Sequence, residues 1–195
     1  NVHGNALGNG NFGLLIQGTT SGVKLQNNVV SGNIGPGVVI SDGSNISIEG
    51  NLIGTSPDGL SARPNDDQGI LNFTSFANLR IGGADPSQRN IISGNNATGI
   101  LIVGDGKVLI IEGNYVGTDI TGGSALPNGE SGIIVADLPK GVRIGGISPG
   151  SGNVVSGNIG VDSHGILVLA SGSIIQGNIV GLDASGTSAL PNDAV

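Results

Sequence analysis

The feature that most constrains this chain is an internal repeat of about 63 residues. The segment Asn90-Ile-Ile-Ser-Gly-Asn95 returns as Asn153-Val-Val-Ser-Gly-Asn158, 63 residues later. The segment Arg80-Ile-Gly-Gly83 returns at the same spacing as Arg143-Ile-Gly-Gly146. A repeat of this size is typical of a solenoid, in which each unit buries its apolar face only by stacking on its neighbours.

Each long repeat contains two shorter units. A glycine followed by three mostly apolar residues opens each unit, and glycine makes up 38 of the 195 residues, as expected of a chain with many tight turns. No apolar run has the helical period over ten residues or more. Three short runs in one unit, at 99–103, 108–112 and 115–117, instead predict three β-strands per unit. The opening glycines are Gly13, Gly37, Gly69, Gly99, Gly132 and Gly165.

These units predict an all-β fold, a right-handed parallel β-helix with about six coils of three short strands. We expect one domain over residues 1–195, with coils beginning near residues 13, 37, 69, 99, 132 and 165. Neither end shows an evident cap in the sequence, and the chain closes on Ala189-Leu-Pro-Asn192, after which another coil would follow. An open coil exposes strand edges and core. Two interpretations remain: a piece cut from a longer array, or copies that stack head to tail into filaments.

A Gly-Asn pair lies between the second and third strands of alternate units. Glycine permits a sharp bend there, and asparagine tolerates the left-handed conformation. We expect the asparagines to be structural and to form a ladder, with each amide hydrogen-bonded to the next. The residues predicted for this ladder are Asn51, Asn114 and Asn178.

The first strands carry apolar residues on both faces. If the second and fourth positions after the glycine face the core, the third faces outward. This outer row predicts either an interface or a surface covered by loops such as 118–131. The second strands have a more polar outer face, where Arg80 would lie between Glu49 and Glu112. The predicted interface row is Leu15, Val39, Leu71, Leu101, Ile134 and Leu167.

The strings Gly113-Asn-Tyr-Val-Gly-Thr-Asp119, Ala125-Leu-Pro-Asn128 and Arg80-Ile-Gly-Gly83 resemble those of right-handed parallel β-helix repeat proteins of the pectate-lyase-like superfold. They are most similar to repeat arrays of large secreted or cell-surface bacterial and archaeal proteins. The resemblance covers essentially the whole chain and implies an extracellular or cell-surface location. It does not specify an activity, because this superfold hosts lyases, hydrolases, epimerases, adhesins and phage tailspikes.

An enzyme of this superfold needs acids and bases that converge on one outer face. Asp66, Asp67 and His164 superficially resemble the aspartates and the Gly-His-Gly of galacturonan hydrolases. They lie nearly 100 residues apart in the chain, hence about three coils or about 14 Å along the axis, and no Arg-x-Lys follows the histidine. Phe73 and Phe76 share one coil, as a small aromatic platform for a glycan or as core filling.

Composition excludes other classes. The net charge is −7 and the basic residues are scattered singly, so we expect no nucleic-acid partner. No apolar run reaches about 18 residues, so we expect no membrane span. No pattern indicates a cofactor or a metal, and Asp119 and Asp183 occupy turns where aspartate binds its own backbone. The sequence thus predicts a non-catalytic extracellular module that self-associates, as a filament subunit or an adhesin stalk; the alternative is a carbohydrate-active or glycan-binding domain.

Overall fold

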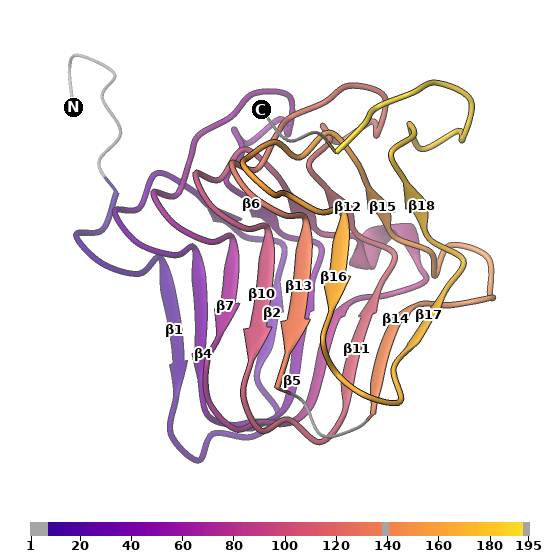
Figure 1. The fold of residues 1–195 in the computed structure, drawn as a ribbon. Helices are drawn as coiled ribbons and strands as arrows, with labels where there is room; N and C mark the ends of the chain where they lie inside the picture. The colour runs from indigo at the N-terminus through magenta and orange to yellow at the C-terminus, as the bar shows by residue number, and fades with distance from the viewer. Residues whose placement is uncertain (1–7, 138–140, 193–195) are drawn as a thin grey trace.

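The computed structural model describes residues 8–137 and 141–192, and it is a right-handed parallel β-helix of six coils. Three parallel sheets of six strands run along its axis, and each coil adds one strand to each sheet in chain order. Figure 1 shows the strands of the first sheet side by side, from β1 at the indigo end to β16 at the orange end.

We number the coils 1 to 6 and call the sheets A, B and C after the order of their strands within a coil. Sheet A contains β1 (Leu14–Gln17), β4 (Val38–Ser41), β7 (Ile70–Asn72), β10 (Ile100–Val103), β13 (Ile133–Ala136) and β16 (Ile166–Val168). Sheet B contains β2 (Lys24–Gln26), β5 (Ser44–Glu49), β8 (Ala77–Gly82), β11 (Leu109–Glu112), β14 (Val142–Gly145) and β17 (Ile174–Gln176). Sheet C contains β3 (Val29–Val30), β6 (Leu52–Ile53), β9 (Ile91–Ile92), β12 (Tyr115–Val116), β15 (Val154–Val155) and β18 (Ile179–Val180).

The core lies between the three sheets and consists mostly of isoleucine and valine. In β10, Ile100 and Ile102 are fully buried, whereas the alternate residues Leu101 and Val103 are half-buried, as strand alternation requires. In register, Ile100 pairs with Ile133 of the next coil. The core is therefore a set of apolar rows parallel to the axis, and each coil buries the side chains of its neighbours.

Glycine is required at the corner between sheets B and C in coil 4. Gly113 has a φ of +70°, and a Cβ atom on it would lie 1.9 Å from the carbonyl oxygen of Gly83. No larger residue fits this corner, because both the backbone conformation and the close approach of the preceding coil exclude a side chain.

Two kinds of long loop alternate along the solenoid. Coils 2, 4 and 6 carry loops at 54–65, 117–128 and 181–192, between sheets C and A, and each is closed by an antiparallel bridge such as Thr118 with Ala125. Coils 3 and 5 carry longer turns between sheets B and C, one of which contains the short 3-10 helix η1 (Pro86–Gln88). The loops of coils 2, 4 and 6 contact one another directly, since Ile120 N–H donates to Gly59 O (3.1 Å) and Ala184 N–H donates to Gly122 O (2.9 Å).

Candidate functional site

The predicted asparagines lie at the corner between sheets B and C, in a ladder with one member per coil. Asn51, Asn114 and Asn178 do not contact one another, because Asn90 and Asn153 lie between them. Each side-chain Nδ2 donates to the Oδ1 of the asparagine in the following coil, over 2.8–3.0 Å. The complete first ladder is Asn28, Asn51, Asn90, Asn114, Asn153 and Asn178.

A second ladder, which the sequence analysis missed, lies at the corner between sheets C and A. Its Nδ2 to Oδ1 distances are 2.7–2.9 Å, and its direction is the same as in the first ladder. The signal was available, because the Ser-Gly-Asn and Pro-Asn motifs alternate from coil to coil and place asparagine at equivalent positions. The second ladder contains Asn33, Asn65, Asn95, Asn128, Asn158 and Asn192.

The ladder amides also satisfy the backbone. Asn114 Nδ2 donates to the carbonyl oxygens of Ile81 (2.9 Å) and Glu112 (3.1 Å), and its backbone N–H donates to Asn153 Oδ1 (3.0 Å). Buried backbone groups at a bend cannot all find partners in the sheets, so the side chains supply them. These asparagines hold one coil to the next.

The structure does not bring Asp66 and Asp67 together with His164. Asp66 is exposed and accepts a hydrogen bond from Asn96 Nδ2 (3.1 Å), while Asp67 accepts one from the backbone N–H of Gln68 (3.1 Å). His164 is exposed in coil 6. These residues form no shared cluster.

Backbone hydrogen bonds between coils give their separation. Gly69 N–H donates to Thr98 O, Gly99 N–H donates to Ser131 O, and Gly132 N–H donates to His164 O, which makes three coil-to-coil steps. At about 4.8 Å per step, the turn that carries Asp67 lies about 14 Å from the turn that carries His164. A general acid and a general base that act on one bond must both reach it, so these residues do not form a catalytic pair.

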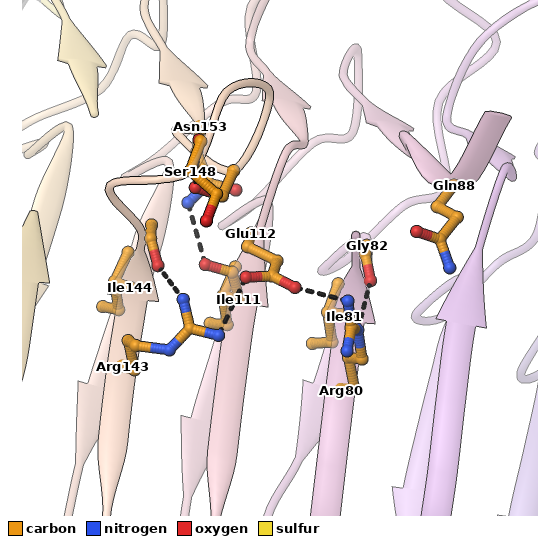
Figure 2. A network of polar contacts seen from close by, with 12 residues as sticks. Arg80, Ile81, Gly82, Gln88, Ile111, Glu112, Arg143, Ile144, Ser148 and Asn153 are labelled. Carbon is orange, nitrogen blue, oxygen red and sulfur yellow. Dashed lines mark hydrogen bonds and ion pairs between the residues drawn. The ribbon is translucent and has the colours of Figure 1, made fainter. Parts of the chain in front are cut away.

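The outer face of sheet B carries a charged cluster of three residues (Figure 2). Of the two glutamates predicted to flank Arg80, only Glu112 forms an ion pair with it. Glu49 instead accepts a hydrogen bond from Gln26. Arg143 reaches the same carboxylate from the other side, over 2.8 Å. The Glu112 side chain is 5% exposed, and those of the arginines are 41% and 30% exposed. The cluster joins coils 3, 4 and 5, and its carboxylate is fully engaged.

The two phenylalanines do not form one aromatic platform. Phe76 is buried, and its ring lies against Gly106, where an added Cβ would be 2.1 Å from the ring. Phe73 is 52% exposed. Phe76 therefore fills the corner between sheets A and B, beside a cavity of about 450 Å³ whose lining includes Asp42, Asp105 and Lys107.

The outer row of sheet A is aligned as the sequence predicted, from Leu15 through to Leu167. Its exposure is uneven: Leu15 is 44% exposed, four members are half-buried, and Val39 is fully buried although it lies in the outward row. Val39 has the shortest side chain of the row and lies between two leucines. The 118–131 loop forms its hydrogen bonds beside sheet C. Ile120 N–H donates to Gly59 O, and Thr118 O accepts a hydrogen bond from the Ser93 hydroxyl.

The aspartates of the long loops bind their own backbone. Hydrogen bonds from the Ser185 hydroxyl and from the N–H groups of Thr187 and Ser188 lower the pKa of Asp183 to about 2. Asp119 accepts hydrogen bonds from Thr121 and Gly123 in the same way. Among residues 8–137 and 141–192, no three His, Cys, Asp or Glu side chains are grouped as metal ligands.

No protein-family model, curated protein or solved structure matches the chain. Within the described part of the chain, no helix is long and apolar enough to span a membrane.

Proposed function

We propose that this chain is a non-catalytic structural module of an extracellular or cell-surface protein, a β-helical rod that acts through its surfaces and associates with further coils. The observation that carries the proposal is the use of its polar side chains. Two asparagine ladders and the Glu112 cluster connect coil to coil. The adjacent Asp66 and Asp67, in contrast, lie three coils away from His164. The repeat strings that resemble secreted and cell-surface arrays support the proposed location.

The absence of catalysis is tested with a double variant. Purified chain and Asp66→Asn/Asp67→Asn are incubated with polyuronides and neutral polysaccharides, and new reducing ends and unsaturated products are measured. We expect no turnover from either protein and the same thermal stability for both. Turnover by the original chain that the double variant lacks would overturn the proposal in favour of a carbohydrate-active enzyme.

Association is tested by negative-stain electron microscopy over a range of concentrations. Six coils at about 4.8 Å predict filaments with an axial repeat of about 29 Å per copy. If the outer row of sheet A is a lateral interface, Leu101→Asp removes side-by-side bundling, while the outward-facing Ile110→Asp on sheet B leaves it intact. Single particles at every concentration would contradict self-association.

A further inference from the structure

A cavity on the outer face of sheet C contains a single charged side chain, which is a cation. The cavity has a volume of about 480 Å³ and lies beside the 146–152 turn of coil 5 and the 181–192 loop of coil 6. Among the described residues its lining includes no aspartate or glutamate, although the chain has 14 acidic and 7 basic residues. We call it the sheet C hollow. The lining side chains that matter here are Arg89, Tyr115, Ile147, Val154, Ile179 and Ala184.

Arg89 is held in place by two contacts with coil 4. Its Nε donates to Gly113 O (3.1 Å), and its guanidinium carbon lies 4.1 Å from the centre of the Tyr115 ring. The ring in turn packs against the 117–128 loop, since a Cβ on Gly122 would lie 2.8 Å from its Cε2 atom. A cation that is already stacked on an aromatic ring and bonded through one nitrogen loses little further freedom when it binds a ligand.

The charge of Arg89 has no counter-ion in the described part of the chain. Arg80 and Arg143 both pair with Glu112, whereas Arg89 forms no ion pair with any residue in 8–137 or 141–192. Within the same ranges its two terminal nitrogens have no hydrogen-bond acceptor, because only Nε donates. A guanidinium edge with free parallel N–H groups matches two oxygens of a carboxylate or a sulfonate. The hollow therefore offers a fixed site for an anionic group.

The other walls of the hollow are apolar side chains and turn backbone. Val154 and Ile179 belong to sheet C, Ala184 comes from the loop of coil 6, and Ile147, which is 86% exposed, comes from the turn. Small-molecule sites have volumes of about 300–1,000 Å³ and combine apolar walls with a few polar groups. A fitting ligand thus has an anionic group for Arg89 and a compact apolar body for these walls.

The hollow arises from the regular alternation of turns and loops. A smaller cavity of about 290 Å³ lies two coils earlier, with Leu52 at the position of Tyr115 and Ile91 at that of Val154. Its lining comes from coils 2 to 4, and further coils flank it on both sides. Such cavities therefore recur inside the rod. The support for Arg89 does not recur, because Tyr115 is the only tyrosine of the chain.

We propose that the sheet C hollow binds an organic anion, with a carboxylate or sulfonate group on the free edge of Arg89 and a compact apolar body against Val154, Ile179 and Ala184. The two head groups share the chemistry that a guanidinium recognises, and the experiment separates them. This inference goes beyond the proposed structural role, because it assigns a ligand site to the side of the rod.

Binding is measured by amide NMR titration of the ¹⁵N-labelled chain with benzoate and with benzenesulfonate. We expect saturable shifts at 146–152 and near Ala184, with a dissociation constant of roughly 0.1–10 mM for a ligand of this size. Acetate and sulfate test the head group alone, and benzamide tests the neutral body. Each should bind at least about ten-fold more weakly, since each lacks either the apolar burial or the charged hydrogen bonds. Saturation by only one aromatic anion would identify the head group.

Arg89→Gln removes the charge at similar length, and Arg63→Gln is the matched control, because Arg63 is an exposed arginine of the 54–65 loop. We expect benzoate to bind Arg89→Gln at least about ten-fold more weakly and Arg63→Gln as tightly as the original chain. A second variant keeps the arginine and its contacts. Ile147→Asp places a like charge beside the ligand and weakens binding several-fold, whereas Ile147→Lys strengthens it.

Three results would overturn the inference: no saturable shift with either aromatic anion, equal affinity of Arg89→Gln and the original chain, or benzamide binding as tightly as benzoate. Acetate that binds as tightly as benzoate would also overturn it, because the apolar walls would then contribute nothing. The proposed structural role is decided separately, by the turnover assay and by microscopy, so the two can fail independently.

Discussion

Two buried asparagines differ in hydrogen bonding and allow a matched test of the ladders. Asn114 and Asn72 are both fully buried. Asn114 Oδ1 accepts a hydrogen bond from Asn90 Nδ2 (2.8 Å), and its Nδ2 donates to three acceptors. Asn72 lies among core side chains of sheet A; its Nδ2 donates to Ile40 O (2.9 Å), and its Oδ1 has no hydrogen-bond partner. Replacing each with leucine therefore removes very different interactions at similar volume.

The expected magnitudes follow from the groups left without partners. Asn114→Leu removes the acceptor of the Asn90 backbone N–H, leaves Asn90 Nδ2 with Ile48 O alone, and removes a donor from Ile81 O. At about 1–3 kcal/mol per buried unsatisfied group, the free energy of unfolding falls by about 3–5 kcal/mol. Asn72→Leu removes an unpaired oxygen and buries an isobutyl group worth about 1.5–3 kcal/mol. It leaves Ile40 O without this donor at about 1–3 kcal/mol, and removal of the unpaired Oδ1 recovers a similar amount, so the apolar burial leaves a net gain of about 1–2 kcal/mol.

Both variants are followed by circular dichroism during thermal and urea unfolding. With about 2–4 °C of Tm per kcal/mol in chains of this size, Asn114→Leu lowers Tm by about 6–20 °C and Asn72→Leu raises it by a few degrees. Unchanged urea m-values show that the two variants unfold from equally compact states. If both substitutions lower Tm equally, side-chain fit rather than hydrogen bonding controls these positions, and the ladder argument is wrong.

Three further perturbations test other parts of the fold. Glu112→Gln lowers the free energy of unfolding, measured by urea titration, by about 2 kcal/mol. Hydrogen bonds to charged groups contribute about 1.5–3 kcal/mol, and the partial exposure of both arginines keeps the value below the upper end. An unchanged midpoint would show that the cluster does not contribute to stability. The pKa of Asp183 in the folded chain, about 2, lies below its usual 3.8, so its carboxylate stabilises the 181–192 loop above about pH 4 and this contribution is lost as the pH falls toward 2. Amide exchange of this loop should therefore accelerate over that window in the original chain and not in Asp183→Asn; equal pH dependence in both would refute the assignment. Gly122→Ala lowers Tm more than Gly186→Ala, since both have φ near +70° but only a Cβ on Gly122 meets neighbouring atoms, and equal losses would mean that backbone strain alone matters.

The architecture could be read from the sequence because the repeat aligns equivalent positions. The opening glycines precede strands of sheet A in every coil, and the outward rows of sheets A and B pair in the predicted register. Parallel stacking with alternating side chains leaves little freedom once the coil starts are known. Repetition therefore carries the information on the fold.

What could not be read from the sequence are choices between equivalent neighbours. Arg80 has a glutamate available on either side, and the pairing with Glu112 depends on Glu49 binding Gln26 and on the path of the arginine side chain. Phe76 lies before its strand, where no period predicts an inward side chain, yet it is buried. The ladder prediction followed the Gly-Asn pairs of alternate coils and so found every second member. Asn90 follows Arg89, and Asn153 follows Gly152 at the end of a longer turn, where the different spacing hid its equivalence.

The contacts between loops two coils apart determine how many coils can be inserted into or deleted from a protein of this kind at once. Removing one coil would bring two long loops into adjacent layers, where Gly59 and Ile120 already leave no free space. Removing or inserting two coils, such as the stretch from Asn65 to just before Asn128, preserves the alternation of long loops and the steps of both ladders. The length of such a rod is therefore quantised in steps of about 9.6 Å, and gene duplication or engineering that respects this step keeps both ladders and the loop row in phase.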